Sequence, residues 1–139
     1  MHPAEDSSSL RAVPGDASNR LALEVEGDWP WEANLVDDTT IYAAGFWENF
    51  GYDPAQMTET FDFLSVMRKR DIPAVTRAWR AHLDGETDSY QSEWRLRTAA
   101  GEWRWIRSRG RITERDATGK PTRMAGAYTD ITSMKLAPL

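Results

Sequence analysis

Cysteine is absent from all 139 residues of the chain. The absence excludes disulfide bonds, thiolate metal ligands and thiol nucleophiles, and it fits a reducing compartment. Histidine is scarce as well, because His2 and His82 are the only two. A structural zinc site is usually built from cysteine and histidine, so the sequence predicts no metal site.

The motifs of common enzyme classes are missing too. The chain has no G-x-S-x-G, phosphate-binding-loop or H-E-x-x-H pattern, and its acidic residues are scattered over turns and helix starts. We therefore expect a domain without catalytic activity. No apolar run approaches the length of a membrane span, and the N-terminus lacks the apolar core of a signal peptide. These absences predict a cytoplasmic segment that makes no membrane contact.

Charge is unevenly distributed along a chain whose net charge is −5. Residues 1–93 hold 7 basic and 18 acidic residues, a net charge of −11, whereas residues 95–123 hold 9 basic and 3 acidic residues, a net charge of +6. Such asymmetry is typical of a nucleic-acid surface, or of a sheet face that pairs with an acidic element of the same or another chain. The negative total disfavours nucleic acid as a partner.

The apolar pattern changes its period along the chain. Residues 1–19 predict a flexible leader, and residues 20–26 a short cap segment that fits a helix or a strand. Two alternating strands, a run of short helices and three further strands follow, which predicts an α+β domain. The predicted strands span 29–35, 40–43, 89–98, 102–114 and 121–131, and the predicted helices begin at Phe46, Asp53, Thr60, Ile72 and Thr132, with Asp71 capping the helix over 72–83.

Several short motifs occur in one order and spacing. They are Gly27-Asp28-Trp29-Pro30-Trp31-Glu32, Ile41-Tyr42 with Phe46-Trp47-Glu48-Asn49-Phe50-Gly51-Tyr52, Glu93-Trp94-Arg95 with Gly101-Glu102-Trp103-Arg104-Trp105-Ile106, and Gly119-Lys120-Pro121 with Gly126, Asp130-Ile131-Thr132 and Lys135. Together they resemble a PAS domain with a C-terminal PAC segment, with a W-x-W-D opening and a D-I-T closing motif. The resemblance implies a five-stranded antiparallel sheet with short helices packed on one face.

The resemblance places the PAS/PAC domain at residues 27–132 and the start of a signalling helix or linker at 133–139. One departure concerns the H-P-D-D block that often precedes the long helix of the family. Here the block reads Arg68-Lys69-Arg70-Asp71, so that only the final aspartate remains.

In PAS domains one sheet face curls around the helices and lines an internal pocket. The resemblance and the strand alternation together predict which residues face it. These residues either bind an unidentified small molecule or simply fill the core. They are Tyr42, Phe46, Phe63, Val75, Trp79, Trp94, Leu96, Ile106, Ser108, Met124 and Tyr128.

The opposite face of the central strand carries Trp103, Trp105, Arg107 and Arg109. Three interpretations remain open for this stripe. The side chains stack on one another, or they contact a second copy or the acidic N-terminal segment, or they bind single-stranded nucleic acid. The acidic total disfavours the third, so we predict a homodimer and no nucleic acid.

The resemblance also implies a role for the C-terminal end and for cofactors. Asp130, Ile131, Thr132 and Lys135 form the junction through which PAS domains pass signals to a downstream output domain. The parent is expected to be a bacterial sensor histidine kinase or cyclic-di-GMP enzyme. The flavin branch needs a reactive cysteine, and the haem branch a histidine nearer Val75 than His82, so we predict no cofactor.

Overall fold

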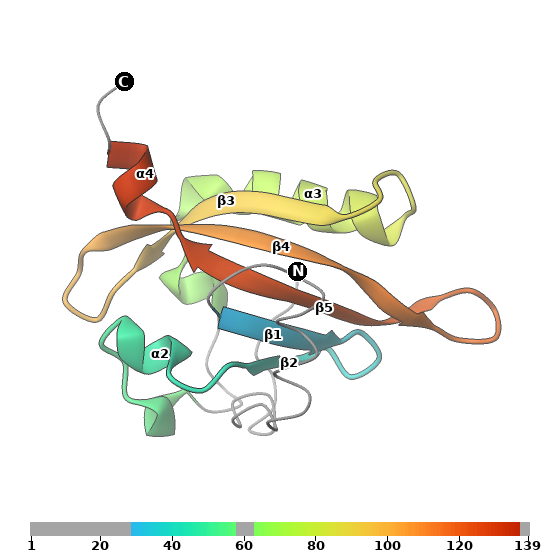
Figure 1. Cartoon of the computed structure of the whole chain (residues 1–139), viewed down its shortest axis with the longest axis horizontal. Helices are drawn as coiled ribbons and strands as arrows, with labels where there is room; N and C mark the ends of the chain where they lie inside the picture. Colours follow the sequence, from blue (N-terminus) through green and yellow to red (C-terminus); the bar gives the residue numbers. More distant parts are fainter. Residues whose placement is uncertain (1–28, 58–62, 137–139) are drawn as a thin grey trace.

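The computed structural model describes residues 29–57 and 63–136, without the side chain of Phe63. The predicted leader (1–19) and cap segment (20–26) lie outside the described residues, and the domain boundaries at 27 and 132 stay predictions. Figure 1 shows the arrangement of the elements. They are β1 (Trp29–Asn34), β2 (Thr39–Tyr42), α2 (Phe46–Asn49), η2 (Pro54–Gln56), η3 (Phe63–Val66), η4 (Lys69–Asp71), α3 (Ile72–Leu83), β3 (Tyr90–Arg97), β4 (Trp103–Arg115), β5 (Pro121–Asp130) and α4 (Thr132–Leu136).

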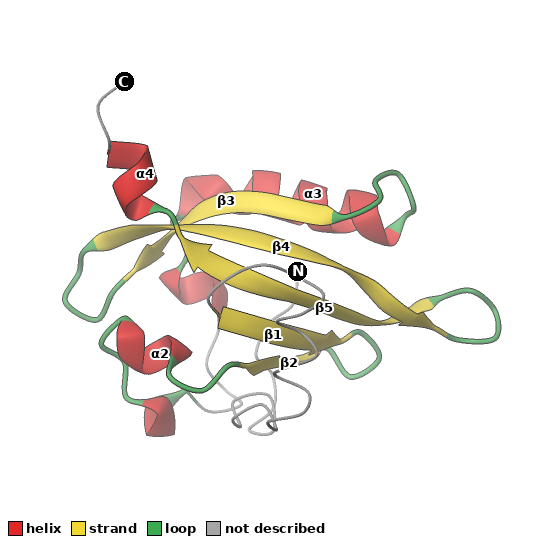
Figure 2. Cartoon of the chain, viewed as in Figure 1, coloured by secondary structure: helices red, strands yellow, loops and turns green. Residues whose placement is uncertain are grey.

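Five antiparallel strands form one sheet in the order β2-β1-β5-β4-β3. The α+β class and the five-stranded sheet with short helices are thereby confirmed (Figure 2). Strands β3, β4 and β5 form the predicted meander, since short turns join them. Strand β1 then pairs with β5, with Trp31 opposite Gly126. The first and last strands of the chain are therefore neighbours at the centre of the sheet.

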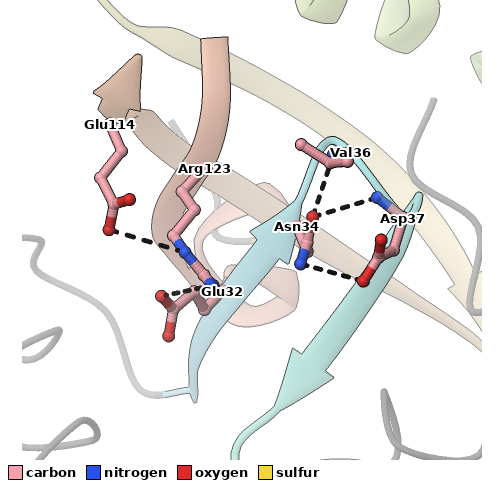
Figure 3. A network of polar contacts seen from close by, with 6 residues as sticks. All are labelled: Glu32, Asn34, Val36, Asp37, Glu114 and Arg123. Atoms are coloured by element: carbon pink, nitrogen blue, oxygen red, sulfur yellow. Dashed lines mark hydrogen bonds and ion pairs between the residues drawn. The ribbon is translucent and has the colours of Figure 1, made fainter. Parts of the chain in front are cut away.

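The β1–β2 hairpin is closed by the side chain of Asn34. Its Oδ1 accepts the backbone N–H groups of Val36 at 2.9 Å and Asp37 at 3.0 Å (Figure 3). This local bonding is the reason why asparagine favours turns. On the neighbouring strands, Arg123 lies between Glu32 and Glu114 at 3.4 and 3.5 Å, so one cation links β1, β5 and β4 (Figure 3).

The inner face of the sheet is packed around Trp31, which is fully buried. Its indole lies over Gly110 and Gly126, which are directly opposite each other on β4 and β5. A Cβ atom at Gly126 would approach Trp31 to 2.4 Å and the carbonyl oxygen of Arg109 to 2.0 Å. Only glycine allows this close approach, so the two glycines leave the space that the indole of Trp31 occupies.

Helix α3 has the bounds that the sequence predicts, and it runs behind β3 in Figure 1. Val75, Trp79 and His82 form its buried stripe, at the spacing of one helical face. Asp71 occupies the N-cap position, but its side chain makes no capping hydrogen bond. The prediction of a side-chain cap is therefore wrong, because both carboxylate oxygens are bonded to Arg95 instead.

The start of the helix predicted from Thr60 lies outside the described residues, and its described part is corrected. The structure has two 3₁₀ turns, η3 and η4, which are separated by Met67 and Arg68. Met67 forms a β-bridge with Leu96, and Arg68 has an extended backbone. This long-range pairing interrupts the helix and buries Met67 to 3% exposure. Within residues 29–57 and 63–136, no helix has the length and apolarity that crossing a membrane requires.

Candidate functional site

The residues predicted to face the pocket come together on the inner face. All ten whose side chains are described are buried, and Phe63 lies in η3 with its side chain outside the description. Sequence reasoning missed two large members of the same cluster, Trp31 and Tyr90. The alternation of Trp29 and Trp31 along β1 and the glycine at position 126 were the available signals for Trp31.

Aromatic rings fill the centre of this face. Phe46 stacks on Tyr128 with ring centroids 5.0 Å apart, and Tyr42 stacks on Phe46 at 5.8 Å. Trp31 lies 5.8 Å from Tyr128 and 6.1 Å from Trp79. These stacked and tilted contacts lie within the centroid separations that aromatic pairs favour.

Two pairs of polar side chains are bonded to each other within the core. Trp94 donates its indole N–H to Ser108 at 2.9 Å, and the Tyr90 and Ser92 hydroxyls lie 2.6 Å apart. Burial raises the pKa of Tyr90 to about 12, and burial likewise raises the pKa values of Tyr42 and Tyr128. The phenols are therefore protonated at neutral pH, and this part of the core carries no charge.

His82 is buried at the end of α3 and joins two segments. Its Nε2 accepts the backbone N–H of Ile112 at 3.0 Å, so its Nδ1 carries the proton and donates to the carbonyl of Thr87 at 2.9 Å. Strand β3 pairs with β4 only as far as Gly110. Beyond that point the imidazole of His82 accepts the backbone N–H of Ile112 on β4. The sequence predicted an ordinary helix-terminal histidine and missed this role.

The hollows at the surface of the described residues include one beside the β2–α2 connection and one along α3. The first has a volume of about 170 Å³, and the second, on the exposed side of α3, has a volume of about 470 Å³. The first is lined by Tyr42, Ala43, Ala44, Gly45, Trp47, Glu48 and Pro54, and the second by Pro73, Thr76, Arg77, Arg80, Ala81 and Glu86. The described residues contain no group of three or more His, Asp or Glu side chains that could hold a metal ion.

On the outer face, Trp103 keeps 44% of its surface exposed, whereas Trp105 is half-buried between two cations. The guanidinium of Arg95 and the ammonium of Lys135 each lie 4.8 Å from the Trp105 ring centroid. A cation at this distance is attracted by the negative face of the ring. Arg95 belongs to β3 and Lys135 to α4, so Trp105 connects the sheet with the C-terminal helix.

Both cations are fixed by carboxylates. Arg95 binds Asp71 at the start of α3 with its Nε at 3.0 Å and its Nη2 at 2.6 Å. Burial alone would raise the pKa of Asp71, but the bonds and charge of Arg95, with the charge of Arg68, outweigh it and lower that pKa. Lys135 binds Glu93 at 2.7 Å, and this bond, with Arg107, lowers the pKa of Glu93.

The predicted junction residues hold the first turn of α4 against β4. The backbone N–H of Trp105 donates to the Thr132 hydroxyl at 2.8 Å, and the N–H of Ile131 donates to the Trp105 carbonyl at 2.9 Å. Asp130 accepts the Thr132 N–H at 2.9 Å and also pairs with Arg104. Figure 1 shows α4 leaving the sheet at the end where the β3–β4 hairpin lies.

The remaining two residues of the predicted stripe, Arg107 and Arg109, lie half-buried on the same outer face. Arg107 approaches Glu93 at 3.5 Å. The four stripe residues therefore share a face. Among them, Trp105 is the residue whose ring contacts a side chain of α4, Lys135.

Comparisons with known proteins agree with this architecture. A family model described as the PAS fold matches residues 40–128, more than half of the chain. A comparison with curated proteins gives no match. Among solved structures, a sensory box histidine kinase/response regulator from Burkholderia thailandensis is 29% identical over 84% of this chain and 86% of that chain, with a TM-score of 0.66.

Two more distant structures have the same fold. The N-terminal domain of a diguanylate cyclase with a PAS/PAC sensor from Marinobacter aquaeolei is 17% identical over 77% of this chain and 97% of that one, with a TM-score of 0.64. A domain of a light and redox sensing histidine kinase from Haloarcula marismortui is 22% identical over 82% and 98%, with a TM-score of 0.61.

Proposed function

Because the chain belongs to the PAS family, we propose that it is a non-catalytic sensory input module of a larger bacterial signalling protein. The likeness to the Burkholderia structure supports a histidine kinase as the parent, and a cyclic-di-GMP enzyme is the alternative. The module acts in the cytoplasm and passes a change in packing from the sheet to the helix that begins at Thr132. Such a change is a shift between populations of docked and released helix.

The observation that carries this proposal is the position of Trp105 between Arg95 and Lys135. Arg95 is bound to Asp71 at the start of the long helix, and Lys135 lies in α4. A movement of α3 relative to the sheet therefore changes the surface on which α4 rests. The route runs through direct contacts of charged and aromatic groups, whose two arrangements are docked and released.

The packing of the core favours protein contact over a core ligand as the input. Trp31 occupies the inner face above Gly110 and Gly126, and Ser108 is bonded to Trp94. The same packing supports a module without flavin or haem, since both ring nitrogens of His82 are bonded to backbone groups. We propose a second copy of the chain as one contact of the outer face, as aromatic and arginine side chains are frequent interface anchors.

Hydrogen exchange of the α4 amides tests the proposed route. Trp105→Leu removes the ring on which both cations rest while keeping an apolar side chain, so exchange at residues 132–136 should rise several-fold. Trp103→Leu is the matched control, because Trp103 makes its cation contact with Arg68 and not with α4. Unchanged α4 exchange in Trp105→Leu, or an equal rise in both variants, contradicts the proposed coupling.

A further inference from the structure

A cluster of positive charge lies at the end of the sheet from which α4 leaves. Trp103 is exposed there, and the guanidinium of Arg68 lies 5.8 Å from its ring centroid. Arg97 is the β3 residue directly opposite Trp103, and Lys69 and Arg70 follow Arg68 in the chain. Lys69, Arg70 and Arg97 are exposed. We define these five residues, which the Arg68–Trp103 contact and the Arg97–Trp103 pairing bring to this end of the sheet, as the basic–aromatic patch.

The patch differs from its surroundings because its cations form no ion pairs within the described residues, although the charge of Arg68 acts on the nearby Asp71. The neighbouring cations each have a carboxylate, since Arg95 pairs with Asp71, Arg104 with Asp130 and Lys135 with Glu93. None of the four patch cations forms an ion pair with any residue that the structure describes. The net charge of the chain is −5, so the patch is a local exception to an acidic protein.

An exposed indole beside unpaired cations is a surface suited to a partner. Tryptophan and arginine are enriched among the residues that dominate interface binding energy, and unpaired cations speed the approach of an acidic partner. A polyanion such as nucleic acid is bound along a basic groove with several stacking rings. Here one exposed ring and four cations form a compact surface, which fits a short acidic segment of a protein better.

The patch is also connected to the α4 contact. The backbone N–H of Arg68 donates to the carbonyl of Arg95 at 2.9 Å, and Arg70 directly precedes Asp71. Arg95 and Asp71 form the ion pair that fixes one of the two cations on Trp105. A partner that orders η4 therefore acts on the residues that support α4.

We propose that the basic–aromatic patch is a docking surface for a carboxylate-rich segment of a partner protein. The segment places its carboxylates on Lys69, Arg70 and Arg97 and an apolar or aliphatic part on Trp103. The consequence for α4 rests on the function proposed above, but the binding itself does not. Binding and coupling are therefore measured separately.

A dye-labelled glutamate homopeptide is the probe, and its fluorescence anisotropy is followed during titration with the whole chain. Binding should be detectable at low ionic strength and should weaken strongly by about 0.3 M salt, since the contacts are exposed charge pairs. Lys69→Glu with Arg97→Glu should weaken binding by about tenfold or more, because two attractions become repulsions. Trp103→Ala should cause a smaller loss, of about threefold.

The matched control is Arg77→Glu with Arg80→Glu, which makes the same change in net charge on the exposed side of α3. Full-strength binding by this control supports the patch, and an equal loss in both double variants overturns it, because net charge alone would then explain the binding. No salt-dependent binding at low ionic strength also overturns the proposal. Tighter binding of a thymidine oligonucleotide of similar charge overturns the choice of an acidic protein segment.

A second copy of the chain, proposed above as one contact of the outer face, is the remaining alternative occupant of the patch itself. Native mass spectrometry that shows a dimer lost only in Lys69→Glu with Arg97→Glu would assign the patch to self-association and overturn the proposal. Peptide binding together with an unchanged α4 exchange in Trp105→Leu would keep the docking surface and remove only the proposed coupling. Absence of peptide binding together with faster α4 exchange in Trp105→Leu would overturn the docking surface and leave the proposed coupling in place.

Discussion

On the inner face of the sheet Trp31 is fully buried, whereas on the outer face Trp103 keeps 44% of its surface exposed. The inner indole is held by ring contacts and by two glycines that admit it. The outer indoles are held by cations, with Arg68 near Trp103 and with Arg95 and Lys135 on Trp105. The same residue type therefore serves two different kinds of contact on the two faces of one sheet.

The difference shows which face is suited to change. Close packing of large apolar groups tolerates little rearrangement, because lost contacts and cavities are costly. Exposed ion pairs and cation contacts are worth little each and are weakened by salt, so they exchange partners readily. The inner face fixes the fold, and the outer face holds the helix whose release we propose to be the signal.

The sharpest test of this contrast replaces one tryptophan on each face. Trp31→Ala should lower the free energy of unfolding by about 4 kcal/mol, because it leaves a large cavity among buried rings. Trp103→Ala should lower it by less than about 1 kcal/mol, since that ring is largely exposed. Urea unfolding followed by circular dichroism measures both. Similar losses for the two variants would break the distinction between the faces.

A smaller effect is expected from the glycine that seats Trp31. Gly126→Ala places a Cβ 2.0 Å from the Arg109 carbonyl oxygen, which is backbone and cannot move aside, so we expect a loss of about 3 kcal/mol. Gly85→Ala is the control, because it meets nothing within 4 Å and suffers only from its positive φ of 82°, at about 1 kcal/mol. Thermal unfolding should rank the two variants. A larger loss of stability in Gly85→Ala than in Gly126→Ala would show that the inner face shifts to accommodate the added Cβ.

The smallest effect concerns the outer face and depends on pH. Asp71→Asn should cost about 1–2 kcal/mol at neutral pH, because Arg95 loses its charged partner. The pKa of Asp71 is lowered in the folded state, so its contribution is complete above its ordinary pKa near 4 and is lost as the pH falls through the lowered value. The wild-type and variant stabilities should therefore converge in acid.

Urea unfolding between neutral pH and the acid limb measures this convergence. Glu102→Gln is the control, since Glu102 is exposed and its side chain has no bond to a residue of the described chain. A constant difference between wild type and Asp71→Asn at all pH values would show that the Asp71–Arg95 pair does not stabilise the fold through its charge. That result would contradict the view that charge contacts hold the outer face.

Most of the fold could be predicted because its signals are local. Alternation placed all five strands to within one or two residues, and the 3.6-residue period gave α3 its observed bounds. Asp53 caps η2 through a bond to the Ala55 N–H, as its position before Pro54 predicted. Sequence periodicity failed where a residue distant in the chain determines the local structure. Met67 forms a β-bridge with Leu96, and this pairing divides the expected helix.

The candidate site divides in the same way. Strand alternation assigned Ile106 and Tyr128 to the inner side and Trp103 to the outer side, since successive side chains point to opposite faces. Alternation could not show that Trp105 would be covered by Lys135, because the two residues meet only after β5 returns beside β4. It also could not show that His82 would bond Ile112 across the sheet edge.

By itself the sequence determined the strand and helix periods, the turns, the lack of cysteine chemistry and the acidic balance of the chain. The tertiary structure alone decided that Trp31 occupies the inner face, that Asp71 binds Arg95 instead of capping its helix, and that Arg68, Lys69, Arg70 and Arg97 gather beside Trp103. The physical reason is the separation along the chain of the residues that interact. Periodicity and capping depend on neighbours along the chain, whereas ring contacts, ion pairs and charge clusters depend on segments that only the folded sheet brings together.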